Sequence, residues 1–321
     1  MPGTAPIVTS LSAIDHEIID CLRADGRISA NEIARTLGAD YRIVRTRLSA
    51  LLDSGTVRIN ALADPALVGN TTVAFLWVES WSASSDVSGL FTRIPEVMWA
   101  ARTTSGTRTV AQISCATAGD LLRIVEEVRS RSTVSTVTAE LVLRSYVGPL
   151  ASTTADGRPD AAVVDTAGSL WLGGPENSRL DDLDHRILDM LRADGRVGLT
   201  AIADTVHVPL TTVRRRVNRL LDIDGVRLRC LVSPMALGYQ HTVGVTVEVT
   251  RDAEGVARFL TTLSDAVWIS EITGAWPVTV ELLARSLDGI DAALAQITAD
   301  DRVRRIRVDY YGETLKETGG W

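Results

Sequence analysis

The sequence predicts an α+β chain made of two copies of one unit, in which three helices precede a sheet domain of order βαββαβ. The first observation is a repeat: DHEIIDCLRADGR at 15–27 returns as DHRILDMLRADGR at 184–196, with ten of thirteen residues identical. The same offset of 169 residues relates further matches as far as Gly69 and Gly238. The second observation is a change within each copy, from helical spacing of apolar residues to the alternation typical of strands.

The first three elements of each copy are predicted helices, because capping residues precede them. In the first copy Asp15 is the expected N-cap of the first helix. Ser29 caps the second helix, and Glu32 three residues later completes a capping box. Asp40 caps a third helix that runs to about Ser54.

A strand-like stretch at 57–61 follows the third helix, as in a winged helix-turn-helix, and the sheet domain comes next. The order βαββαβ is that of a ferredoxin-like sheet with helices on one face. The expected elements of the first copy are 71–79, 86–93, 97–104, 108–115, 119–131 and 134–146, and those of the second copy are 242–250, 253–263, 267–273, 277–283, 287–298 and 303–311. Gly106 corresponds to Gly274, which falls one residue short of the constant offset between the copies. The difference suggests one inserted residue in the first copy.

These elements divide the chain into five expected segments. They are a winged helix-turn-helix at 11–62, a ferredoxin-like regulatory domain at 63–147, a linker at 148–179, a second winged helix-turn-helix at 180–232 and a second ferredoxin-like regulatory domain at 233–315. The linker is rich in Gly, Pro, Ala, Ser and Thr and has room for a short strand at 169–172.

Positive charge is concentrated on the third helix of each copy and the strand after it. The formal net charge of the whole chain is −7, which by itself does not favour a nucleic-acid partner. Residues 41–60, however, hold four arginines against one aspartate, and residues 210–229 hold six arginines against two aspartates. Binding depends on where charge lies, and such clusters supply the salt-dependent phosphate contacts of DNA-binding proteins.

The side of each third helix opposite its apolar stripe carries residue types that reach base edges in a major groove. Arg47 and Arg216 lie about 60° from the stripe, at its edge, and either contact a phosphate or anchor the helix internally. The expected DNA-binding residues are Arg42, Arg45, Thr46, Arg47 and Ser49 in the first copy and Thr211, Arg214, Arg215, Arg216 and Asn218 in the second.

Each copy resembles the Lrp/AsnC (leucine-responsive/asparagine-responsive) family of bacterial transcriptional regulators. The resemblance rests on the three-helix unit, the βαββαβ module, Arg-Leu-x-x-Leu at 47–51 and Arg-Val-x-x-Leu at 216–220. The opening patterns at 11–19 and 180–188 are similar to the first helix of that family. The resemblance implies a RAM-type sheet domain that mediates dimerisation and binds a small effector, commonly an amino acid.

The resemblance therefore implies an effector-responsive, sequence-specific regulator whose partners are double-stranded DNA, an amino acid or related metabolite, and further copies that associate through the sheet domains. Because two copies share one chain, we expect their sheet domains to pair as an intrachain pseudo-dimer. The two reading faces differ, so we expect unlike half-sites about one helical turn apart. Apolar runs are short and no signal peptide is evident, so we expect a cytoplasmic protein without a membrane partner.

The expected effector site departs from the family pattern. Family members usually carry Gly-Asp-x-Asp after the second strand of the sheet domain, but the stretches at 105–109 and 273–277 lack the aspartate. Either the ligand differs, or one or both sites are vestigial, or both stretches are ordinary turns. The residues expected to contact an effector are Gly106, Thr107, Arg108, Thr273, Gly274 and Trp276.

An enzyme is the competing interpretation, because siroheme decarboxylases share this two-copy architecture. Their chemistry needs histidine and arginine around an iron tetrapyrrole in the sheet domains, whereas only one of the four histidines here, His241, lies near a sheet domain. Phosphate loops, Gly-x-Ser-x-Gly and zinc-ligand spacings do not occur. We therefore expect no catalytic residues, no metal and no cofactor. A ligand-sensing or architectural protein that no longer reads sequence is a third alternative.

Overall fold

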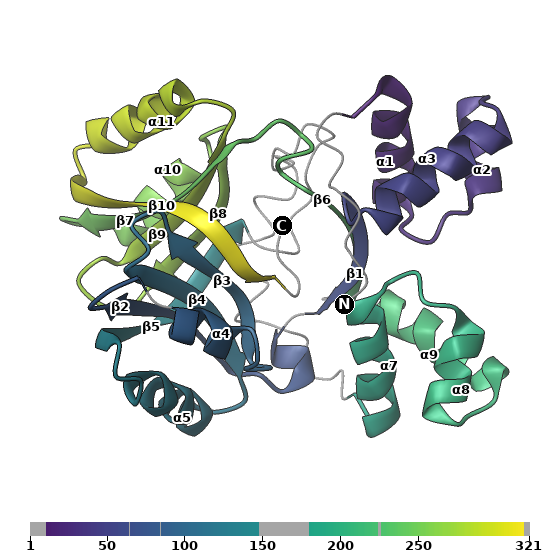
Figure 1. The fold of residues 1–321 in the computed structure, drawn as a ribbon, viewed down its shortest axis with the longest axis horizontal. Helices are drawn as coiled ribbons and strands as arrows, with labels where there is room; N and C mark the ends of the chain where they lie inside the picture. The colour runs from purple at the N-terminus through teal and green to yellow at the C-terminus, as the bar shows by residue number, and fades with distance from the viewer. Residues whose placement is uncertain (1–10, 64, 84, 148–179, 224–225, 318–321) are drawn as a thin grey trace.

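The computed structural model describes residues 11–63, 65–83, 85–147, 180–223 and 226–317. The predicted strand at 169–172 lies outside these residues. The helical units of both copies lie together on one side of the molecule, and the sheet domains of both copies lie together on the other (Figure 1). The two copies therefore do not fold as separate bodies joined end to end.

Three helices form each helical unit, as the sequence predicts. The first unit consists of α1 (Ala13–Ala24), α2 (Ala30–Leu37) and α3 (Tyr41–Asp53), and the second of α7 (Asp182–Ala193), α8 (Leu199–Val206) and α9 (Leu210–Asp222). The capping box of Ser29 and Glu32 and the Asp40 cap are confirmed. The first N-cap was assigned wrongly: Ser12 caps α1, and Asp15 is its partner at the third helical position.

A two-stranded ribbon joins the helical units to each other. Strand β1 (Val57–Ala63) follows α3, strand β6 (Val226–Val232) follows α9, and the two pair antiparallel along their whole length. The ribbon residues Ile59 and Cys230, which lie opposite each other, both belong to the apolar core of the first unit. The strand after each third helix thus pairs with the other copy.

Both sheet domains have the predicted order βαββαβ. The first contains β2 (Thr72–Ser80), α4 (Ser85–Phe91), β3 (Val97–Thr103), β4 (Arg108–Cys115), α5 (Ala118–Arg129) and β5 (Val134–Val147), after the short 3-10 helix η1 (Pro65–Val68). The second contains β7 (His241–Val249), α10 (Ala253–Leu260), β8 (Ala266–Ile272), β9 (Val278–Ala284), α11 (Leu287–Ala299) and β10 (Val303–Glu317).

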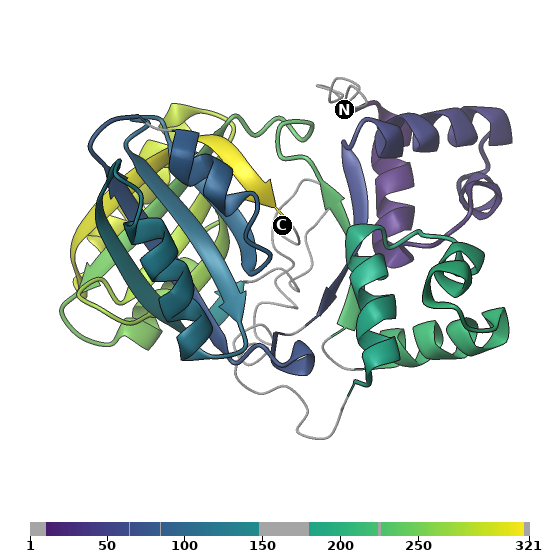
Figure 2. The same ribbon diagram turned by 60° about the horizontal axis from the view of Figure 1, so that its bottom comes forward.

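The two sheets close into one barrel through their long last strands. Strand β5 pairs first with β2 of its own copy and then with β8, while β10 pairs with β7 and then with β3. The strand order around the barrel is β10-β3-β4-β2-β5-β8-β9-β7. Helices α4, α5, α10 and α11 cover its outside (Figure 2), and an aromatic cluster that includes Trp77, Trp99 and Tyr311 fills part of its inside.

The inserted residue that the glycine shift suggested is not there. Val97 pairs with Ile113 in the first copy and Ala266 pairs with Leu282 in the second, so the offset between copies is the same on both sides of the hairpin turn. The turns have equal length and place their left-handed glycine at different positions: Gly106 has φ 74° and the second-copy glycine φ 106°.

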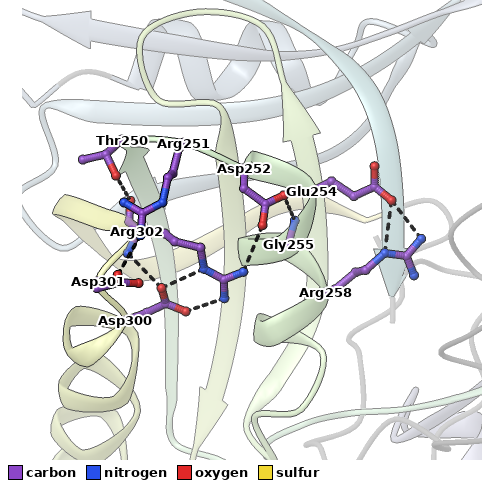
Figure 3. Close-up of polar contacts among 9 residues, drawn as sticks. All are labelled: Thr250, Arg251, Asp252, Glu254, Gly255, Arg258, Asp300, Asp301 and Arg302. Carbon is purple, nitrogen blue, oxygen red and sulfur yellow. Dashed lines mark hydrogen bonds and ion pairs between the residues drawn. The ribbon is translucent and has the colours of Figure 1, made fainter.

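A cluster of polar side chains lies in the second copy, around the start of α10 and the end of α11 (Figure 3). The Arg302 guanidinium donates to Asp300 at 2.6 Å and to Asp252 at 3.1 Å, which ties the turn before α10 to the turn after α11. Asp252 adopts φ 54° and caps α10 by accepting from the Gly255 N–H at 3.0 Å. At the positions that match Asp252, Asp300 and Arg302 the first copy has Ala83, Arg131 and Thr133, which cannot form the same set of bonds.

Candidate nucleic-acid interface

The third helix of each unit turns one face outward, and neither helix lies between its unit and the barrel (Figures 1 and 2). The buried stripes are Val44, Leu48 and Leu51 in α3 and Val213, Val217 and Leu220 in α9. Eight of the expected DNA-binding residues are exposed, namely Arg42, Arg45, Thr46, Ser49, Thr211, Arg214, Arg215 and Asn218. The packing of each unit therefore leaves these side chains available to a partner.

Arg47 and Arg216 differ from the other eight residues because each binds carboxylates inside its own unit. Arg47 donates to Asp15 through Nε at 2.8 Å and Nη2 at 2.5 Å. Arg216 donates to Asp181 at 2.6 Å and to Asp184 at 3.0 Å. These bonds tie the third helix to the start of the first helix in both units. We therefore leave both arginines out of the proposed base contacts.

Asp15 is held as a carboxylate by this arrangement. Its side chain is fully buried, and burial alone works to raise its pKa. Hydrogen bonds from Arg47 and Ser12 outweigh the burial, so the pKa of Asp15 lies below its usual value. The charged pair thus fixes the orientation of α3 relative to α1.

A reciprocal pair of arginines, which we call the arginine clasp (Arg27 and Arg196), joins the two helical units. Arg27 donates to the carbonyl oxygens of Gly195 at 2.7 Å and Val197 at 2.8 Å. Arg196 donates to those of Gly26 at 2.6 Å and Ile28 at 2.9 Å. Each copy thus clamps the turn after the first helix of the other copy.

The glycine of each turn is required by the ribbon beneath it. A Cβ at Gly26 or at Gly195 would lie 2.9 Å from the Cγ2 atom of Ile59. The Gly195 N–H also donates to the Ile59 carbonyl oxygen at 2.7 Å. The sequence contained the signal for this contact, since Ala-Asp-Gly-Arg is identical in both copies, but a repeat does not say what its residues touch.

Part of the positive charge that follows the third helices is used internally. Arg58 on β1 binds Glu317 at the end of β10 at 2.5 Å. Burial lowers the pKa of Arg229 on β6 to about 10, since its guanidinium is largely removed from solvent. The charge available to a nucleic acid therefore lies mainly on α3 and α9 rather than on the ribbon.

The two turns of the expected effector site meet at one end of the barrel. Thr107 and Arg108 line a cavity of about 340 Å³, and Arg108 and Trp276 together line a smaller neighbouring cavity of about 50 Å³. Arg305 and Arg307 stack on the Trp276 ring at 5.0 Å and 4.9 Å from its centroid. Residues from both copies thus contribute to one site.

The remaining three expected effector residues shape the turns. Gly106 and Gly274 both have left-handed backbone conformations, which favour glycine. A Cβ at Gly274 would lie 2.7 Å from Oε1 of Glu140, so the turn approaches β5 closely. The Thr273 hydroxyl accepts from the Leu141 N–H at 2.9 Å, which attaches the same turn to the other copy.

Carboxylates reach this end of the barrel from strands that the sequence did not single out. Glu140 on β5 accepts from the Trp77 indole N–H at 2.7 Å, and Asp309 on β10 accepts from Arg108 at 2.8 Å. Burial raises the pKa of both acids. They occupy matching positions in the two copies, and an acid repeated at the offset of 169 residues was the signal that could have found them.

Comparison with known proteins places both helical units among DNA-binding domains. A model of the AsnC-type helix-turn-helix domain matches residues 180–221, and a model of a winged helix-turn-helix DNA-binding domain matches residues 11–58. An uncharacterized HTH-type transcriptional regulator of Pyrococcus furiosus is 32% identical over 117 residues, which cover 36% of this chain and 79% of the relative. Another from Pyrococcus abyssi is 29% identical over 115 residues, which cover 35% and 73%.

A solved structure shares the fold over most of the length of both proteins. The siroheme decarboxylase NirDL superposes with a TM-score of 0.62 over 95% of this chain and 92% of its own, at 13% sequence identity. The likeness shows a common duplicated fold. Among the residues described here, no helix is long and apolar enough to span a membrane, and no group of His, Cys, Asp and Glu is arranged to hold a metal ion.

Proposed function

The chain belongs to the Lrp/AsnC family of helix-turn-helix transcriptional regulators, and we propose that it binds a two-part operator sequence-specifically, as an intrachain pseudo-dimer that responds to a small effector. The observation that carries the proposal is the pair of exposed faces on α3 and α9, rich in Arg, Thr, Ser and Asn. These side chains can donate to base edges and phosphates in a major groove.

Three contacts between the copies support the pseudo-dimer. Strands β1 and β6 pair along their whole length, β5 and β10 each cross into the sheet of the other copy, and the arginine clasp fixes the helical units. In a family whose usual members carry one copy, such contacts would form between two chains. One duplicated chain can therefore present both reading helices to one duplex.

The operator we propose has unlike half-sites, since the two reading faces differ. Arg42 in α3 corresponds to Thr211 in α9, and Thr46 corresponds to Arg215. Arginine pairs best with guanine, whereas threonine has no strong preference. A footprint with two identical half-sites of equal affinity would contradict this expectation.

An effector site at the barrel end is supported by charge of both signs around its cavities. Arg108 and Arg307 can bind a carboxylate, and Glu140 can accept from an ammonium group. Both copies line the site, so a ligand there would tighten or loosen their contact. Acidic side chains on β5 and β10 thus take the place of the aspartate that the turns lack.

Described strands close the barrel, so further copies would associate through its outer helices.

Selection of bound fragments from the source genome with the purified chain tests these proposals together. We expect an asymmetric motif, and a change in affinity when amino acids are added. The double variant Arg45→Ala, Arg214→Ala should weaken specific binding by about 1–3 kcal/mol per lost base contact, or flatten the salt dependence if the contacts are to phosphate. Unchanged affinity and salt slope would remove α3 and α9 from the interface.

Siroheme decarboxylation is the second candidate, because NirDL shares the fold over 95% of the chain. His241, the first residue of the barrel strand β7, pairs with Ala284. The cavity lined by Arg108 and Trp276 contains no histidine in its described lining. Titration of iron uroporphyrin with the purified protein distinguishes the candidates: an enzyme of this class would shift the Soret band of the added porphyrin, and the regulator proposed here would leave that band unchanged.

A further inference from the structure

Ile43 is a large apolar side chain on the outward surface of α3, among the proposed reading residues. Ile43 is 53% exposed, whereas Ile18 and Ile33 of the same unit are fully buried. It lies in the first turn of α3, directly after the exposed Arg42 and beside Thr46 one turn later. This is the end of a recognition helix that contacts bases in helix-turn-helix proteins.

The Ile43 side chain does not pack into the apolar core of its own unit. The apolar core of the first unit takes Val44, Leu48 and Leu51 from α3, and Ile43 is not among the residues that pack against it. The backbone N–H of Ile43 donates to the Asp40 cap at 3.3 Å, so its position is set by the start of the helix. An isoleucine exposed here contributes little hydrophobic stabilisation to folding.

We propose that Ile43 contacts the C5 methyl group of a thymine in the half-site bound by the first unit, and so makes that unit prefer thymine at one position. The inference rests on the proposed function, since it requires α3 in a major groove. The thymine methyl is the one apolar group that base pairs offer in that groove. The flanking arginines Arg42 and Arg45 supply the charge that brings the helix to the phosphates.

The second unit serves as an internal comparison. Thr212 stands at the position that corresponds to Ile43, and it is smaller, more polar and half-buried. Tyr41 and Leu210, by contrast, are a matching apolar pair at the start of the two helices, with 45% and 39% exposure. A contact made by that pair would be common to both half-sites, whereas the contact made by Ile43 distinguishes them.

Replacement of single thymines by deoxyuridine tests the proposal, because it removes the methyl group and leaves every hydrogen bond of the base pair. The full chain is titrated with its selected operator and with versions that carry one deoxyuridine at each thymine in turn. At one position we expect the wild-type affinity to fall about four-fold, the effect of losing one buried methyl group. The Ile43→Ser variant should show no loss at that position.

Leu287→Ser is the matched control, since Leu287 is also 53% exposed but lies on α11 of the second sheet domain. It should keep the wild-type response to deoxyuridine. A selected operator that binds equally well with every deoxyuridine, or an Ile43→Ser variant that keeps the same four-fold loss, overturns the inference alone. A selection that returns no sequence preference overturns the proposed function and the inference with it.

Discussion

Removal of the arginine clasp should loosen the spacing between the two reading helices. The ribbon of β1 and β6, the clasp and the bond from the Gly195 N–H to the Ile59 carbonyl oxygen hold the helical units together. The ribbon can twist and bend about its length, whereas Arg27 and Arg196 each grip two carbonyl oxygens in the opposite unit. We expect the double variant Arg27→Ala, Arg196→Ala to keep the β1–β6 ribbon but to lose the fixed angle between the two helical units.

The size of the effect follows from four hydrogen bonds of 2.6 to 2.9 Å with charged donors. A hydrogen bond to a charged group contributes about 1.5–3 kcal/mol when it is well buried. Burial, followed by the neighbouring positive charge of Arg27, lowers the pKa of Arg196, so desolvation offsets a good part of that gain. We therefore expect the double variant to lose about 2 kcal/mol of the free energy that holds the two helical units in place. This loss shifts the equilibrium roughly 30-fold toward arrangements in which the units are no longer held together by the clasp.

Operators with altered half-site spacing provide the assay. One added base pair increases the distance between the half-sites by about 3.4 Å and rotates one half-site relative to the other by about 35°. The wild type should lose affinity at each step, and the double variant should show a flatter profile with a weaker optimum. Arg251→Ala is the control, because its pair with Asp301 is largely exposed and contributes little. An identical spacing profile for wild type and double variant would refute the reasoning.

Three further predictions concern stability. Gly195→Ala should cost about 1–3 kcal/mol in urea unfolding, because its Cβ would overlap the ribbon, while Gly89→Ala, with open space around it, should be neutral or stabilising by about 0.4–1 kcal/mol. Asp15→Ala should cost about 3 kcal/mol in the same assay, since it leaves its arginine partner unpaired; an unchanged midpoint would contradict that role. Hydrogen bonds from Arg302 lower the pKa of Asp300 to about 2, so their stabilisation is present above about pH 4 and lost as pH falls toward 2. Acid unfolding of Asp300→Asn should therefore lack this component, and an acid titration identical to that of the wild type would exclude it.

Local signals in the sequence determined the elements and the surface that the proposals use. The repeat predicted two copies, and the caps Ser29 and Asp40 predicted where two helices begin. The 3.6-residue spacing of α3 predicted that Val44 is buried and that Arg45 is exposed. These predictions succeed because capping and periodicity depend on residues within a few turns of one another.

The residues that meet when distant segments come together were decided by the tertiary structure. Periodicity assigns a strand at 57–61 but not the partner it pairs with, and that partner is β6 of the other copy. Wheel geometry placed Arg47 at the edge of the stripe, and only the packing of α1 against α3 made Asp15 its partner. Spacing of residues along one chain describes local conformation, whereas strand exchange, the clasp and the barrel end depend on which surfaces meet in space.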